Sequence, residues 1–210
     1  MIYFDMLPKE QRQIYHELSF TKEYGFVLFG GTAIALQLGH RVSVDFDFFR
    51  KEELISNDKK KIENFFAPVT ILQDEKNTFV FLTQNGVQLS FFGSISFVQK
   101  ENAIVLDNVL LAAKMTDLLA TKLKATFDRA EYKDYRDIAE ILKNGGTTLQ
   151  EGFQKMKDFF GAGSFSQMQV LKNLTFFDDG NVSKLSEDDQ QFLIKEVKRF
   201  LKSIKSAGQR

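Results

Sequence analysis

The segment Phe26–Arg50 constrains the fold more than any other part of the chain. It reads FVLFGGTAIALQLGHRVSVDFDFFR. Its first apolar run, Phe26–Phe29, is typical of a buried strand and ends at two glycines. A helix-compatible stretch, Ala33–Leu38, follows, and Thr32 is a suitable cap for it. The second apolar run, Val42–Phe49, carries two aspartates. The order predicts strand, glycine turn, helix and strand.

The two aspartates of this segment are Asp45 and Asp47. Residues i and i+2 of a strand project to the same face, so both carboxylates point together while Phe46 and Phe48 face the core. Two carboxylates held this close repel each other, and a hard divalent cation is the usual reason to keep both ionised. We therefore predict that Asp45 and Asp47 bind Mg²⁺ or Mn²⁺ and join it to a nucleoside triphosphate in a phosphoryl or nucleotidyl displacement.

The paired glycines Gly30 and Gly31 stand at the start of the predicted helix. Backbone without side chains approaches phosphate oxygens closely there, and the helix dipole favours the anion. Thr32, Arg41 and Ser43 are predicted to contact the same phosphates. A glycine pair alone is usually a turn, and a lone Asp-x-Asp is usually solvated. The combination, in this order, favours a functional site.

The remaining elements predict an α+β fold. The first half is mixed, with helices Pro8–Phe20 and Lys51–Phe66 and strands Val69–Leu72, Thr78–Leu82 and Val87–Phe92, the last two joined by a hairpin at Thr83–Gly86. The second half is helical, with helices at Asn108–Phe127, Asp134–Lys143, Thr148–Phe160, Ser166–Leu171 and Glu187–Ile204. We predict a boundary near residue 100, with an α/β core at 1–100 and a helical domain packed against it at 101–210.

Composition excludes several classes of protein. Lys plus Arg and Asp plus Glu balance at 28 each, so overall charge gives no support for a nucleic-acid or membrane partner. The chain has no cysteine, which excludes thiolate metal sites and suits a reducing cytoplasm. No apolar stretch approaches the roughly 18 to 20 residues that span a bilayer. The 23 phenylalanines predict a core built on Phe rings.

The segment GGTAIALQLGHRVSVDFDFF resembles the signature of the AbiEii/AbiGii toxin group of nucleotidyltransferases, within the DNA polymerase-beta-like superfamily. The resemblance implies a polymerase-beta-like core, NTP as substrate with Mg²⁺, and transfer of a nucleotidyl group to an RNA end such as tRNA, or to a protein hydroxyl. It also implies a toxin of a toxin–antitoxin or abortive-infection system, with a cognate antitoxin as possible partner. The superfamily often has a third metal-binding carboxylate on a later strand, where this chain has Ser90. Either Asp45 and Asp47 suffice, another acid such as Asp107 substitutes, or activity is weak or lost.

The segment Thr121–Leu142 resembles the basic and acidic series that follows the active-site strand in the same group. By that resemblance, Lys122 and Lys133 contact phosphates and Asp137 is a general base, with Arg129 as a further phosphate contact. One continuous helix would place these residues on one stripe. A pause near Glu131 would instead let Asp134 cap a new helix, with Asp137 completing a capping-box-like pair. The alternative for all of them is a solvated face with weak ion pairs.

Two alternatives to the transferase stay open on the sequence alone. One is a catalytically silent nucleotide- or partner-binding module of the same fold. The other is a metal-dependent phosphoesterase. It fits Asp45 and Asp47, but this sequence lacks the extra His and Asp ligands that such sites usually need. The C-terminal helix Lys195–Arg210 is also basic, with Lys195, Lys198, Arg199, Lys202, Lys205 and Arg210 against Glu196. It is read either as a nucleic-acid contact or as a solvated basic tail.

Overall fold

The computed structural model describes residues 2–207 and divides them into two compact units, which meet in the sequence at Lys114 and Met115. The first unit contains a mixed seven-stranded sheet of order β3-β4-β5-β2-β1-β7-β6. Its strands are β1 (Val27–Phe29), β2 (Asp45–Phe49), β3 (Val69–Glu75), β4 (Thr78–Thr83), β5 (Gln88–Phe92), β6 (Ile104–Leu106) and β7 (Leu110–Ala112). Its α-helices are α1 (Lys9–Ile14), α2 (Phe20–Glu23), α3 (Gly30–Leu38) and α4 (Ser56–Phe66).

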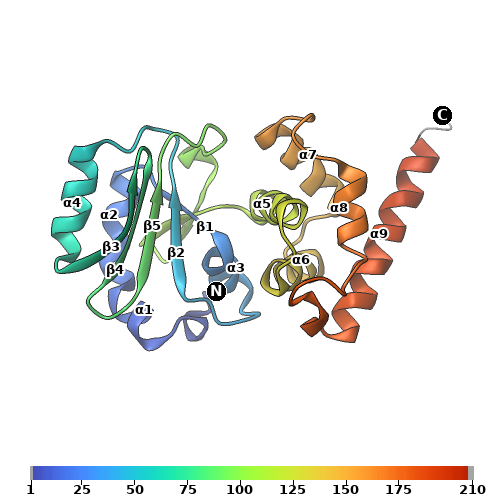
Figure 1. Cartoon of the computed structure of the whole chain (residues 1–210), viewed down its shortest axis with the longest axis horizontal. Helices are drawn as coiled ribbons and strands as arrows, with labels where there is room; N and C mark the ends of the chain where they lie inside the picture. The colour runs from blue at the N-terminus through green and yellow to red at the C-terminus, as the bar shows by residue number, and fades with distance from the viewer. Residues whose placement is uncertain (1, 208–210) are drawn as a thin grey trace. The chain divides into compact units, whose positions relative to one another are not determined.

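The centre of the sheet is formed by β5, β2 and β1. β2 pairs antiparallel with β1 and parallel with β5, and β1 pairs parallel with β7. In Figure 1 the strands β3, β4, β5, β2 and β1 follow one another in this order. The helix α3 connects β1 to its neighbour β2, so the glycines that begin α3 directly follow the strand that pairs with the aspartates of β2. The predicted strand, glycine turn, helix and strand are confirmed.

Phenylalanine rings form the core on one face of this sheet, as the composition predicts. Phe48 and Phe91, from the paired strands β2 and β5, stack with ring centroids 5.3 Å apart. Phe20 of α2 lies 6.4 Å from Phe91, and Phe66 of α4 lies 5.8 Å from Phe81, so both helices cover this face. Aromatic pairs at such distances contribute about 0.5–1.5 kcal/mol each beyond their area burial.

The second unit is helical. Its elements are α5 (Met115–Asp128), α6 (Tyr132–Asn144), α7 (Leu149–Phe160), α8 (Gln167–Asn173), a 3₁₀ turn at Val182–Lys184 and α9 (Glu187–Ala207). The helix α7 approaches α5 closely at Gly152, where an added Cβ would lie only 2.6 Å from Leu119 Cδ2. Phe153 of α7 packs on Phe200 of α9 with centroids 5.3 Å apart. Thr148 and Glu151 form a capping box at the start of α7, which lies within the helix predicted over Thr148–Phe160.

Several predicted elements are corrected. The helix predicted from Asn108 begins at Met115, because Leu110–Ala112 is β7. Asp107 and Asn108 have φ of 48° and 56°, and Val109 N–H donates to Leu106 O at 2.9 Å. Two consecutive residues with positive φ are the signature of a tight hairpin turn. The predicted boundary near residue 100 therefore falls between β5 and β6, inside the first unit.

The helix bounds of the first unit also differ from those predicted. The segment expected as one helix at Pro8–Phe20 is split by a 3₁₀ turn, Tyr15–Ser19, between α1 and α2. The helix predicted from Lys51 begins only at Ser56. None of the helices within residues 2–207 combines the length and the apolar character needed to cross a bilayer.

Candidate active site

The first glycine of the pair, Gly30, lies against the carboxylate of Asp47. β1 ends at Phe29, which pairs with Asp47 across the antiparallel ladder. Gly30 has φ of +72°, and an added Cβ would lie 2.6 Å from Asp47 Oδ2. Positive φ and this close approach both require glycine. The turn therefore brings bare backbone next to one of the two predicted metal ligands.

The second glycine, Gly31, lies against Arg41 and Ser43. An added Cβ there would collide with Arg41 Nη2 and would lie 3.1 Å from Ser43 Oγ. The half-buried Arg41 also donates from Nη1 to Val42 O at 3.0 Å. The structure thus brings together Gly30, Gly31, Arg41, Ser43 and Asp47, which the sequence analysis grouped on spacing alone.

Thr32 does not cap the helix, because α3 already begins at Gly30 and Phe29 is its N-cap, without a side-chain cap hydrogen bond. The Thr32 hydroxyl is buried; it donates to Asp45 O and lies 2.9 Å from Ser43 Oγ. This hydroxyl ties the first turn of α3 to the strand β2. It positions the glycine turn beside the aspartates.

Asp45 and Asp47 share one face of β2, as predicted. Both are half-buried, whereas Phe46 and Phe48 between and after them are fully buried on the other face. The carboxylates are therefore accessible on the face opposite the phenylalanine core. Two carboxylates with further waters and substrate phosphates are a usual ligand set for Mg²⁺.

Ser90 stands directly opposite Asp47 on the neighbouring strand β5, and Gln88 stands opposite Asp45. Side chains in register on adjacent strands point to the same face. Ser90 is only 2% exposed. Within residues 2–207 no group of three His, Cys, Asp or Glu side chains is placed to hold a metal ion. Asp107, in the β6–β7 turn, forms no such group with Asp45 and Asp47.

The helix break predicted near Glu131 is present, because α5 ends at Asp128 and α6 begins at Tyr132. The predicted cap at Asp134 is wrong, since the N-cap is Glu131 and makes no side-chain cap hydrogen bond. Asp134 and Asp137 are both fully buried in the second unit. Lys122 Nζ lies 2.7 Å from Asp134 Oδ1 and 2.8 Å from Asp137 Oδ2.

This buried ion cluster sets the protonation of Lys122. Burial by itself would lower the pKa of the lysine, but the charges of Asp137 and Asp134 and their hydrogen bonds raise it above its usual value. Arg129 adds a second cation, with Nε 3.0 Å from Asp134 Oδ2. Lysine, arginine and two aspartates give a cluster with no net charge. Asp134, the central acceptor of this cluster, was predicted only as a helix cap.

Arg129 and Lys133 differ from Lys122 in exposure. Their side chains are 50% and 51% exposed, and Lys133 Nζ lies 3.3 Å from Glu131 Oε2. Burial by itself would lower the pKa of Arg129, but the hydrogen bond and charge of Asp134 raise it. The four predicted residues therefore separate into a buried pair, Lys122 with Asp137, and two half-exposed cations.

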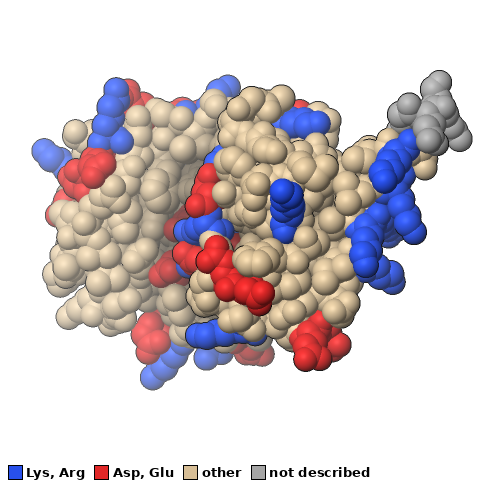
Figure 2. Space-filling model, turned by 45° about the vertical axis from the view of Figure 1, so that its right-hand side comes forward, with Lys and Arg blue, Asp and Glu red and all other residues tan. Residues whose placement is uncertain are grey.

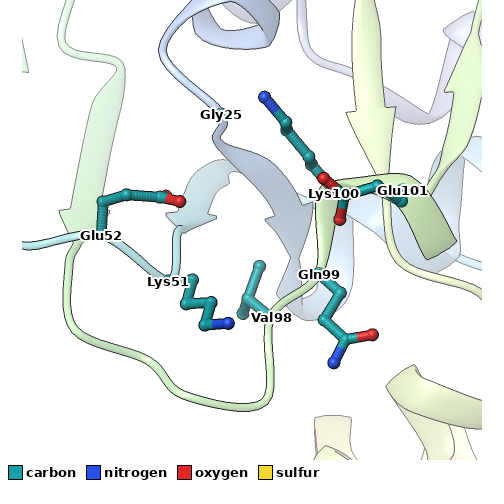
Figure 3. Close-up of a pocket in the computed structure, with 7 residues that line it drawn as sticks. All are labelled: Gly25, Lys51, Glu52, Val98, Gln99, Lys100 and Glu101. Atoms are coloured by element: carbon teal, nitrogen blue, oxygen red, sulfur yellow. The ribbon is translucent and has the colours of Figure 1, made fainter.

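A separate hollow of about 180 Å³ lies in the first unit (Figure 3). It is lined by Gly25, Lys51, Glu52, Val98, Gln99, Lys100 and Glu101. Gly25 precedes β1 and Lys51 follows β2, and in the ladder Val27 pairs with Phe49 while Phe29 pairs with Asp47. The hollow therefore lies at the other end of the β1–β2 pair and includes none of the predicted site residues.

Solved structures share this fold. A protein of H. pylori, described as a candidate nucleotidyltransferase, matches with a TM-score of 0.60 and 19% identity, over 95% of either chain. The Megavirus polyadenylate synthase matches with a TM-score of 0.50 and 15% identity, over 65% of this chain and 32% of that one. At these identities the likeness shows the fold. The sheet order, the glycine turn and the paired aspartates thus define a protein of the nucleotidyltransferase fold.

The family follows from the sequence as a whole. The family model described as "Nucleotidyl transferase AbiEii toxin, Type IV TA system" matches residues 15–209. The chain belongs to the AbiEii nucleotidyltransferase family, which confirms the predicted resemblance. A relative, an uncharacterized protein of Aquifex aeolicus (strain VF5), is 28% identical over 214 residues, which cover 94% of this chain and 98% of the relative.

Proposed function

We propose that the protein is a metal-dependent nucleotidyltransferase that transfers a nucleotidyl group from an NTP to an RNA, such as tRNA, or to a protein hydroxyl. The observation that carries the proposal is the position of Gly30 against the carboxylate of Asp47. A backbone turn that approaches phosphate and a carboxylate that binds its counter-ion are needed side by side for this chemistry. Membership of the AbiEii family supports the same class of reaction.

The residues on β2 and α3 have distinct proposed roles. Asp45 and Asp47 hold Mg²⁺ or Mn²⁺, which when bound neutralises charge on the triphosphate. The backbone at Gly30 and Gly31 approaches the phosphate oxygens, and Arg41 supplies a positive charge beside them. In the reaction the acceptor oxygen attacks the α-phosphorus, the bond from that phosphorus to the β-phosphate oxygen breaks, and pyrophosphate leaves.

For the helical unit the proposed roles rest on the family resemblance. Lys133 and Arg129 are half-exposed and contact phosphates. Asp137 takes the proton of the attacking hydroxyl as general base, and Lys122 holds it in position from 2.8 Å. In this arrangement Lys122 acts through Asp137, because its own ammonium is already engaged by two buried carboxylates.

The biological setting is proposed from the family. The family is described as a toxin of a type IV toxin–antitoxin system. We propose that this chain is the toxin component, acts in the cytoplasm on an intracellular acceptor, and has a cognate antitoxin. Co-expression with the neighbouring reading frame, scored as rescue of growth, tests this part of the proposal.

A second candidate function is a catalytically silent module that binds nucleotide or a partner protein. The observation that favours it is Ser90, which stands opposite Asp47 where a third carboxylate would complete the ligand set. Two carboxylates suffice for Mg²⁺ when substrate phosphates supply further ligands. The transferase is therefore the leading proposal, and the two differ in turnover.

The test compares transfer with binding. The protein is incubated with labelled NTPs, Mg²⁺ and total RNA, and Asp45→Asn and Asp47→Asn are compared with the wild type. A matched control, Asp74→Asn, removes one carboxylate from β3, where its side chain is 54% exposed. The proposal expects labelling in the wild type and the control only. Labelling that survives both site variants contradicts it, and calorimetric binding of Mg²⁺–NTP without any labelling identifies the silent module.

A further inference from the structure

One face of α9 carries a dense row of exposed cations. The row consists of Lys195, Lys198, Arg199, Lys202 and Lys205, called here the α9 basic face, and each is exposed. Their spacing of three and four residues places them on one side of an α-helix. The opposite side carries the buried residues Leu193, Val197 and Phe200. Figure 2 shows Lys and Arg side chains gathered along this helix. Arg210, included in the predicted basic tail, lies outside the described residues.

Only one cation of the α9 basic face has an ion pair among the described residues. Within residues 2–207, the four lysines of the α9 basic face have no ion pair, and Arg199 Nη1 lies 3.8 Å from Glu196 Oε1. The Arg199 side chain is 80% exposed, whereas that of Glu196 is 18% exposed. An ion pair with one partner in solvent and a separation near the limit of about 4 Å is weak. The positive charge of the face is therefore almost fully available to an external partner.

The fold does not require this arrangement. Cations suit the last turn of a helix, where they interact with the helix dipole, and only Lys205 lies there. Like charges at i,i+3 and i,i+4 destabilise a helix by about 0.2–0.5 kcal/mol per pair. The face contains such pairs throughout, for example Lys195 with Arg199 and Lys198 with Lys202. Charges that weaken the free helix are explained by a partner that compensates them.

We propose that the α9 basic face binds the phosphodiester backbone of the RNA acceptor. The inference rests on the proposed transferase function and assigns to the acceptor a docking surface on α9. The face offers charge without exposed aromatic rings, so it contacts phosphates rather than stacking on bases. Binding there is independent of base sequence and depends strongly on salt.

A partner protein and a membrane surface both fit this face less well than RNA. Protein interfaces are depleted in lysine and have an apolar core, whereas the α9 basic face has four lysines beside the half-buried Ile194. A membrane-surface helix inserts its apolar side, but that side of α9 is buried in the second unit through Leu193, Val197 and Phe200. RNA requires only the exposed charges.

The first experiment measures affinity for a fluorescein-labelled oligouridine by anisotropy over a range of salt concentrations. For single strands the slope of log K against log salt is about −0.7 per phosphate neutralised, so five contacts give about −3.5. Lys198→Gln with Lys202→Gln is expected to make the slope shallower by about 1.4, which corresponds to roughly tenfold weaker binding at 0.15 M salt. Lys198→Arg with Lys202→Arg keeps the charge and is expected to keep the slope.

A matched control removes the same charge elsewhere. Lys60 and Lys61 are exposed on α4 of the first unit, and their double substitution by Gln is expected to leave the slope unchanged. An unchanged slope in the α9 variant, or an equal loss in the α4 variant, overturns the inference. Tighter binding to anionic vesicles or to an acidic polypeptide such as polyglutamate than to the oligouridine also overturns it.

The second experiment separates this inference from the proposed function. The transfer reaction is measured with RNA acceptors and, in a parallel arm, with DNA acceptors of the same sequence. The α9 variant is expected to raise KM for the RNA acceptor about tenfold while KM for NTP is unchanged. Transfer by the wild type with an unaltered RNA KM in the variant, or transfer to DNA only, overturns the docking surface. Absence of all transfer, with the salt slope still reduced in the variant, refutes the transferase and leaves the RNA-binding face standing.

Discussion

Replacing Lys122 with methionine is expected to destabilise the second unit strongly. Lys122 Nζ lies within 2.8 Å of two carboxylates, Asp134 and Asp137, and both aspartates are fully buried. Methionine fills a similar volume but leaves the carboxylates to repel each other away from water. Removing one partner of a buried ion pair costs about 3–5 kcal/mol. Arg129 is half-exposed and shared between Asp134 and Glu131, so it does not replace the lost ammonium.

The expected cost depends on pH in a defined direction. In the variant, protonation of Asp134 or Asp137 removes the uncompensated charge, so the difference from the wild type shrinks as the medium becomes acidic. At alkaline pH the stability of the wild type depends on Lys122. Burial lowers the pKa of this lysine, but Asp137 and Asp134 raise it overall. The stability that this ammonium contributes is fully present below the usual lysine pKa and is lost as pH rises through the higher folded value.

The assay must report on the second unit. Native-state hydrogen exchange of the amides in α5 and α6 gives the free energy of opening of this unit. Urea unfolding followed by circular dichroism gives the free energy of unfolding of the whole chain. Lys124→Met is the matched control, because Lys124 pairs with Asp128 at i,i+4 on the surface and such a pair contributes about 0.3–0.5 kcal/mol.

Two results would refute the reasoning. One is a loss in Lys122→Met no larger than in Lys124→Met. The other is a loss that stays constant from neutral to acidic pH. A further variant that combines Lys122→Met with Asp134→Asn and Asp137→Asn removes the repulsion, and it is expected to recover part of the lost stability.

Three shorter predictions concern other described contacts. Asp189→Asn is expected to lose about 1.5–3 kcal/mol, because Asp189 is buried and bonded to Arg136 and Lys143. Burial raises the pKa of Asp189, but these cationic partners and a serine hydroxyl lower it overall. The stability that Asp189 contributes is therefore present above the usual aspartate pKa and disappears as pH falls through the lower folded value. Urea unfolding at several pH values should show the free energies of unfolding of wild type and variant converging in acid. Gly30→Ala is expected to cost about 1–2 kcal/mol from its positive φ and to abolish Mg²⁺–NTP binding in calorimetry, and full binding would contradict the proposed phosphate turn. Ser90→Asp is expected to tighten Mn²⁺ binding in titration, and unchanged affinity would show that this position does not face the metal ligands.

The sequence by itself determined the local framework of the site. Gly30 and Asp47 belong to one short segment in which apolar runs, a glycine pair and an alternating Asp-x-Asp each have a direct backbone meaning. The same locality explains why the β4–β5 hairpin was correctly predicted, because its turn residues and flanking strands are contiguous. The β6–β7 hairpin was missed although its Asp-Asn turn was visible, because the surrounding apolar residues also suit a helix.

Only the tertiary structure decided which distant residues meet. Ser90 lies opposite Asp47 because β5 pairs in parallel beside β2, and strand order is a long-range choice that periodicity does not encode. Lys122 lies between Asp134 and Asp137 because the helix is interrupted between α5 and α6 and α6 packs on α5. Residues predicted to form one stripe on a continuous helix therefore include a buried ion cluster. The local sequence pattern therefore predicted which residues gather at the glycine turn, whereas sheet pairing and burial determined the partners and charge states of the residues.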